Sequence, residues 1–215
     1  MASNVVSGFL PSSHGFRFAN TWPRSPAWTF DLGLLQVGIG DVGRGLCGGM
    51  VFGARDRFEQ GRVAAVDPAP PAPGSALFRE IVARQWASFG RLLSVPLRFW
   101  LASALGTERS RLRATVRQAW PAIRAEIDAG RPAMVGLVRE AGLNPLAVGM
   151  GHQVLAFRYD VAADGIRLGV YDPNHPGDDA VEVGIERGPG GAIRHVQSTG
   201  EPLLGLLHLP YAPPR

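Results

Sequence analysis

The stretch GHQVLAFRYDVAADGIRLGVYDPN, residues 151–174, predicts two antiparallel β-strands joined by a tight turn. Its two arms, 151–161 and 165–172, alternate apolar and polar residues or run through β-branched ones, which is typical of strands. The segment DVAADG between them has the composition of a β-hairpin turn. Because the start of one strand lies beside the end of the next in such a hairpin, we expect His152 to lie next to Asp172.

Outward from this hairpin, the C-terminal part of the chain predicts further strands and the N-terminal part predicts helices. The other expected strands cover 132–140, 180–187, 192–199 and 203–211, with one earlier strand around 28–37. The expected helices run from Cys47 to about Gln60, from Ser75, from Pro96, and from Thr107 or Ser110 to Gly130. Helices first and antiparallel strands second predict an α+β fold. We expect a single domain, 1–215, with a loosely structured N-terminal wrap (1–40), a mainly helical half (45–130) and a mainly β half (131–215).

The only cysteine of the chain, Cys47, stands at the start of a predicted helix in GRGLCGGMVFGARDRF, residues 43–58. The positive end of the helix macrodipole and the free backbone N–H groups there favour the thiolate, which is the nucleophilic form. Gly45 permits a tight turn before the helix, and Gly48 and Gly49 would let a substrate backbone approach closely. The alternative is a buried, unreactive cysteine that only packs.

Cys47, His152 and Asp172 supply the residue types of a nucleophilic triad, in which a base activates the thiol and a carboxylate orients the base. Asn174 is the alternative orienting residue. Gly151, which precedes His152, lets the imidazole project at the start of its strand. With Gly48 and Gly49, it is expected to line the substrate-binding site.

Three motifs in this order carry a family resemblance: GLCGGM (45–50), GHQVLAFRYD (151–160) and YDPN (171–174). They resemble the papain-like cysteine peptidase superfamily, and most closely the bacterial C39-like peptidase domains. The resemblance covers residues 40–175. It implies a papain-like α+β fold, with Cys47 as the nucleophile at a helix N-terminus, His152 as the general base and Asp172 as the orienting residue.

The resemblance implies a thiol-dependent acyl-transfer enzyme, by default a peptidase or amide hydrolase acting on a peptide or amide substrate. The same triad serves transglutaminases, deamidases and acetyltransferases, and the fold alone does not choose among them. A papain-like module that binds a peptide or a partner protein without catalysis is the alternative of a different class.

One position departs from the family pattern. Papain-like enzymes place an oxyanion-hole glutamine about six residues before the cysteine, and Asp41 stands there in this chain. An ionised carboxylate donates no hydrogen bond, so another amide must serve. Asn20 and Gln36 are the candidates, and we favour Asn20 because of the aromatic and polar residues around it.

The composition excludes several other functions. The net charge is +4 with 22 basic residues, all arginine. The densest basic run, 108–118, is expected to be the solvated face of an amphipathic helix, so we expect no nucleic-acid partner. No apolar run approaches a membrane span and the N-terminus has no signal-peptide pattern, so we expect no membrane association. One cysteine forms no internal disulfide, which favours a cytoplasmic location.

We expect neither a metal nor a cofactor. The acidic segment DPNHPGDD, 172–179, lacks the ligand pattern of a calcium loop, and the other histidines have no partner at zinc-ligand spacing. The sequence leaves the oligomeric state open.

Overall fold

A computed structural model describes residues 1–22, 26–31, 36–41, 45–63, 67–142 and 151–214, and for 26–31, 36–41 and Pro189 it describes the backbone only. The elements in chain order are β1 Ala2–Val5, α1 Pro11–His14, β2 Pro26–Asp31, β3 Gln36–Asp41, α2 Cys47–Glu59, α3 Ala76–Ser88, η2 Arg91–Leu93, α4 Ser94–Ala104, α5 Glu108–Ala114, η3 Thr115–Ala119, α6 Trp120–Asp128, β4 Ala133–Val138, β5 His152–Ala162, β6 Gly165–Tyr171, β7 Glu182–Arg187, η5 Pro189–Gly191, β8 Ile193–Gln197 and β9 Gly205–His208.

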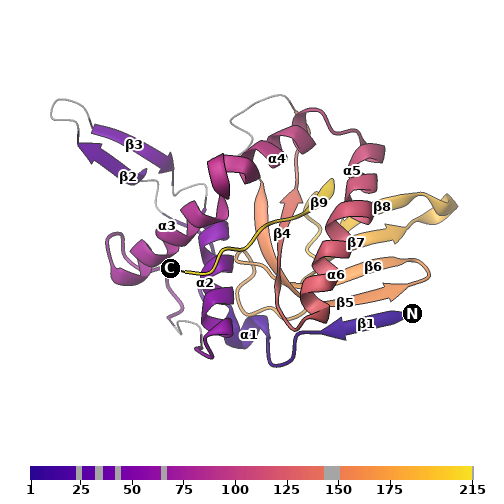
Figure 1. The fold of residues 1–215 in the computed structure, drawn as a ribbon, viewed down its shortest axis with the longest axis horizontal. Coiled ribbons are helices and arrows are strands. Elements are labelled where there is room, and N and C mark those ends of the chain that lie inside the picture. The colour runs from indigo at the N-terminus through magenta and orange to yellow at the C-terminus, as the bar shows by residue number, and fades with distance from the viewer. Residues whose placement is uncertain (23–25, 32–35, 42–44, 64–66, 143–150, 215) are drawn as a thin grey trace.

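The centre of the structure is a seven-stranded antiparallel sheet. Its order is β8-β7-β6-β5-β4-β9, and β1 pairs with the distal half of β5. The hairpin predicted over 151–172 is confirmed, since Ala162 pairs with Gly165 across a two-residue turn. All the strands expected after residue 131 are present, so the chain is a mixed helix-and-sheet structure of the α+β class (Figure 1).

Two helices begin at the capping residues that the sequence predicts, whereas α4 begins at Ser94, two residues before the expected Pro96, and has no side-chain cap. Ser75 accepts a hydrogen bond from the backbone N–H of Phe78 (3.2 Å) and starts α3. Thr107 and Ser110 form a reciprocal capping box at the start of α5. The long helix expected beyond Thr107 is present as α5, η3 and α6, but η3 is a π-helical turn. Pro121, in the first turn of α6, has no backbone N–H, and the α-helical hydrogen-bond ladder is interrupted just before it.

The sheet and the helices share a continuous apolar core. It joins α2 (Val51, Phe52) and α6 (Ile123, Ile127) to buried residues of β4, β5, β6 and β7. A smaller cluster under the N-terminal segment packs α2 against α3, and contains Phe16, Phe18, Trp22, Leu46, Met50, Phe78, Ile81 and Val82. This second cluster fixes the start of α2, where Cys47 stands.

The N-terminal segment is more ordered than the sequence predicts. Residues 2–5 add a strand to the sheet, and Phe9, Phe16 and Phe18 are buried. The described part of residues 1–40, expected to be a loosely structured wrap, thus contributes a strand of the main sheet and three buried phenylalanines. Four exposed residues in β1 carry no apolar alternation, which is why the strand has no sequence signal.

The early strand expected around 28–37 is replaced by a small hairpin. Strands β2 and β3 pair with each other in a separate two-stranded sheet, with Trp28 opposite Ile39. Residues 32–35 of the expected strand lie outside the described residues. In the described part of the chain, no helix combines the length and the apolar character needed to cross a bilayer.

Candidate active site

His152 and Asp172 meet at one end of the central hairpin. His152 is the first residue of β5, and Asp172 directly follows the last residue of β6. The antiparallel pairing brings their side chains together, with 2.6 Å between His152 Nε2 and Asp172 Oδ1. The contact expected from the sequence is present. Because Nε2 is bonded to the carboxylate, Nδ1 is the ring nitrogen that remains for another partner.

Cys47 is that partner. It is the first residue of α2, and the His152 side chain and the backbone N–H groups of Gly48 and Gln153 lie near enough to its thiol to lower the pKa of Cys47. Both reacting side chains are nearly buried, with exposed fractions of 8% for Cys47 and 5% for His152. The structure thus brings Cys47, His152 and Asp172 together in one row, with His152 in the middle.

The electrostatics of the row favour an ion pair. Burial alone would raise the pKa of Cys47, but the hydrogen bond and the positive charge of His152 lower it below its ordinary value. Burial alone would lower the pKa of His152, but the charge and hydrogen bond of Asp172, with the contact to Cys47, raise it to about 9. The two shifts have opposite signs, and both favour a thiolate facing an imidazolium.

Asp172 is held as a carboxylate by groups on three sides. It is fully buried, and its Oδ1 also accepts a hydrogen bond from the backbone N–H of Asn174 (2.8 Å). Burial would raise its pKa, but His152, the Asn174 N–H and Arg139 lower it. Arg139 Nη2 lies 3.8 Å from Asp172 Oδ2, and that oxygen has no hydrogen-bond partner among the described residues.

Arg139 is in turn held by Glu201. Its two terminal nitrogens donate to the two oxygens of Glu201 at 2.8 and 3.0 Å. This bidentate geometry fixes the guanidinium behind Asp172. Neither residue is predicted by the sequence analysis, because the pair joins positions 62 residues apart and neither lies in a motif.

Asn20 lies directly beside the start of α2. Its Oδ1 accepts hydrogen bonds from the backbone N–H of Leu46 (2.6 Å) and from Trp22 Nε1 (3.1 Å), which fixes the orientation of the amide. Its Nδ2 donates to Asn174 Oδ1 (3.3 Å). Since an amide nitrogen carries two hydrogens, a second donor remains on Nδ2 next to the cysteine loop.

Gly45 makes the close approach of Asn20 possible. Its φ is +92°, in the region that favours glycine, and a Cβ there would overlap the Asn20 amide. The residues that would form the expected tight turn with Gly45, 42–44, lie outside the described residues. Gln36, the other oxyanion candidate, lies at the start of β3, and its side chain lies outside the described residues.

The three glycines expected to line the substrate are packed against the protein itself. A Cβ at Gly48 would overlap Ser88 Oγ, and one at Gly49 would overlap the carbonyl oxygen of Ile81. Both positions therefore serve the close packing of α2 against α3 instead of leaving room for a substrate backbone. A Cβ at Gly151 would meet the ring of Phe99, which lies on α4.

Two glutamines that the sequence analysis did not single out complete the site. Gln85 Oε1 accepts the backbone N–H of Gly49 (2.8 Å) and so caps the first turn of α2. The backbone N–H of Gln153 helps to lower the pKa of Cys47, and the buried Gln153 side chain donates to Ser88 Oγ (3.3 Å). Neither has a sequence signal, because both act through the packing of α3 and β5 against α2.

Asp172, His175 and Glu201 place one possible metal ligand each within 4.8 Å of the others. Arg139, which is paired with Glu201, already supplies a positive charge at this point. A cation would have to compete with that guanidinium, so we assign no metal to the cluster.

Comparison with protein-family models, with curated proteins and with solved structures gives no match for this chain. The function must therefore be argued from the geometry of the site.

Proposed function

We propose that the protein is a papain-like, thiol-dependent acyl-transfer enzyme that hydrolyses a peptide or amide bond. The observation that carries the proposal is the position of His152, which is bonded to the buried Asp172 and lies near enough to Cys47 to lower the pKa of the thiol. A lone structural cysteine needs no such partner, whereas a nucleophile needs a base and an oriented base needs an acceptor.

In the first step the Cys47 thiolate attacks the substrate carbonyl carbon, and the carbonyl oxygen becomes an oxyanion. The oxyanion collapses, the bond from carbon to nitrogen breaks, and the imidazolium of His152 gives its proton to the departing amine. In the second step neutral His152 takes a proton from water, which attacks the thioester. The acid is released, and the thiolate and the imidazolium form again. An acceptor amine in place of water would give transfer instead of hydrolysis.

The donors for the oxyanion come from the start of α2. We assign the Cys47 backbone N–H and the free hydrogen of Asn20 Nδ2 to this role, in place of the glutamine of the family pattern. The bonds from Leu46 and Trp22 hold the Asn20 amide in advance, and donors that need no rearrangement are the effective ones. Arg139 and Glu201 act behind Asp172 by keeping it ionised and fixed.

The test compares the wild type with Cys47→Ser on a mixed library of peptides and amides, with product masses as the readout. Serine keeps the shape of the site but hardly ionises, so we expect a loss of about 10³-fold or more. Asp160→Asn, an exposed carboxylate on β5, is the matched control and should keep full activity. If the wild type converts nothing that Cys47→Ser leaves intact, catalysis is refuted and a binding module remains.

We further propose a cytoplasmic location. The free thiol chemistry of Cys47 requires a reduced cysteine, and the reducing cytosol maintains one.

A further inference from the structure

A groove lined by arginines lies beside the edge strand β9, among α4, α5 and η3. It consists of two adjoining hollows that share Ala114 and Gln118. The first, of about 240 Å³, lies between α4, η3 and β9, and the second, of about 380 Å³, lies along α5. Arg98 lines the first hollow, and Arg109 and Arg113 line the second. We call these two hollows the arginine groove.

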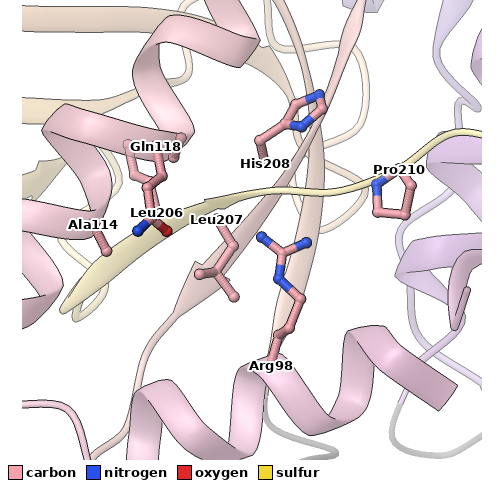
Figure 2. Close-up of a pocket in the computed structure, with 8 residues that line it drawn as sticks. Arg98, Ala114, Gln118, Leu206, Leu207, His208 and Pro210 are labelled. Carbon is pink, nitrogen blue, oxygen red and sulfur yellow. The ribbon is translucent and has the colours of Figure 1, made fainter.

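The shape of the groove follows from the π-helical turn. Residues Thr115–Ala119 form one wide turn between α5 and α6, and Thr115 Oγ1 accepts the backbone N–H of Leu206 on β9 (3.1 Å). This contact fixes η3 against the edge strand, so Gln118 and Ala119 face the first hollow. Figure 2 shows Arg98 reaching from α4 toward β9, where Leu207 and His208 lie. Such wide turns are frequent at functional sites.

The arginines of the groove have no acidic partner among the described residues. Arg98, Arg109 and Arg113 form no ion pair with any carboxylate in the described ranges, and no described aspartate or glutamate lines either hollow. Other arginines do find acidic partners, such as Arg124 with Asp128 and Arg167 with Asp164. Arg98 is exposed as a residue, and the partial burial of its guanidinium lowers its pKa.

The remaining lining residues decide which anion fits. Leu206, Leu207 and Pro210 give the first hollow an apolar side, and Thr107 and Ser110 give the second hydroxyl groups. Neither hollow is lined by a described Phe, Tyr or Trp, so nucleic-acid bases would find no ring on which to stack. These groups suit aspartate and glutamate side chains of a polypeptide. The planar guanidinium of arginine binds a carboxylate through two parallel hydrogen bonds, and the aliphatic residues can pack against the methylene groups of the acidic side chain.

We propose that the arginine groove binds an acidic peptide segment, with Arg98, Arg109 and Arg113 each pairing with a carboxylate. The run 108–118, expected from the sequence to be only a solvated face, thereby has a binding role on two of its arginines. This inference does not depend on the chemistry at Cys47, because none of Cys47, His152 and Asp172 lines either hollow.

The test measures binding of a fluorescein-labelled hexaglutamate peptide by fluorescence anisotropy. All proteins carry Cys47→Ser, so that neither catalysis nor its absence affects the result. The double variant Arg98→Gln/Arg113→Gln removes two cations from the groove. The double variant Arg124→Gln/Arg167→Gln removes two cations of equal charge elsewhere, and circular dichroism checks that both fold.

We expect saturable binding that weakens with salt and that falls about tenfold or more in the groove variant but not in the control. Absence of saturable binding up to about 1 mM peptide would overturn the proposal, as would an equal loss in both variants. A labelled oligothymidylate serves as the competing class. Tighter binding of that oligonucleotide, lost in the groove variant, would replace the peptide with a nucleic acid and refute the proposal.

Discussion

Replacing Asp172 with asparagine should weaken the stabilisation of the Cys47 thiolate by a charged His152 while leaving the shape of the site almost unchanged. Asparagine keeps an oxygen that can accept from His152 Nε2 and from the Asn174 N–H, at the places where 2.6 and 2.8 Å bonds now lie. It removes the negative charge that, against burial, raises the pKa of His152. The pKa of His152 should therefore fall, and without the imidazolium the pKa of Cys47 should rise.

The size of the effect follows from the pKa of His152, which stands at about 9 against an ordinary 6.5. That difference corresponds to about 3 kcal/mol of preference for the imidazolium, and Asp172 supplies the larger share. The sign is clear: a raised pKa means that the imidazolium persists until pH rises through about 9. Each unit by which the pKa of Cys47 rises lowers the thiolate fraction about tenfold at lower pH.

The assay is carbamidomethylation of the single cysteine by iodoacetamide, followed by intact mass across a pH series. We expect labelling of Asp172→Asn at about pH 6 to be at least about tenfold slower than in the wild type, with the onset moved to higher pH. Asp160→Asn is the control and should behave as the wild type. An unchanged onset in a folded Asp172→Asn protein would refute the ion-pair account.

Three further predictions concern the packing and the surroundings of the site. Gly49→Ala forces a Cβ against the Ile81 carbonyl and should lower the free energy of unfolding in urea by about 1–3 kcal/mol, whereas Gly142→Ala, in open space, should not; equal midpoints would contradict the packing role. Asn20→Ala should lower kcat/KM about 10²-fold without changing the rate of Cys47 labelling, and a parallel fall in labelling would show a structural role instead. Arg139→Gln removes a positive charge that lowers the pKa of Asp172, so Asp172 should keep its proton to a higher pH. The onset of Cys47 labelling should therefore move to higher pH, by less than in Asp172→Asn, and no movement would exclude Arg139 from the network.

The local features of the chain were predictable because their signals are local. The hairpin around DVAADG, the caps at Ser75 and Thr107 and the helix start at Cys47 depend on nearest neighbours, and each is present. The contact of His152 with Asp172 was also predictable, since hairpin geometry alone places them together.

The features that the sequence did not predict depend on packing between distant segments. The sequence predicts that Gly48 and Gly49 let a substrate backbone approach, but in the structure their small size lets α3 pack closely against α2. The bidentate contact of Arg139 with Glu201 joins β4 to the segment before β9, and no periodicity marks either residue. The π-helical turn is only partly predictable. Pro121 indicates where the α-helical hydrogen bonds are interrupted, but a kink or the start of a new helix would be equally compatible with a proline there.

The most direct test of the central claim is the titration of the Cys47 thiolate by its ultraviolet absorbance, in the wild type and in His152→Ala. The chain has one cysteine, so the thiolate signal has a single source. We predict a wild-type pKa clearly below the ordinary value of about 8.5, and a pKa above it in His152→Ala, where burial is no longer opposed by the imidazolium. A wild-type pKa at or above about 8.5, or one that the loss of His152 leaves unchanged, would contradict the account.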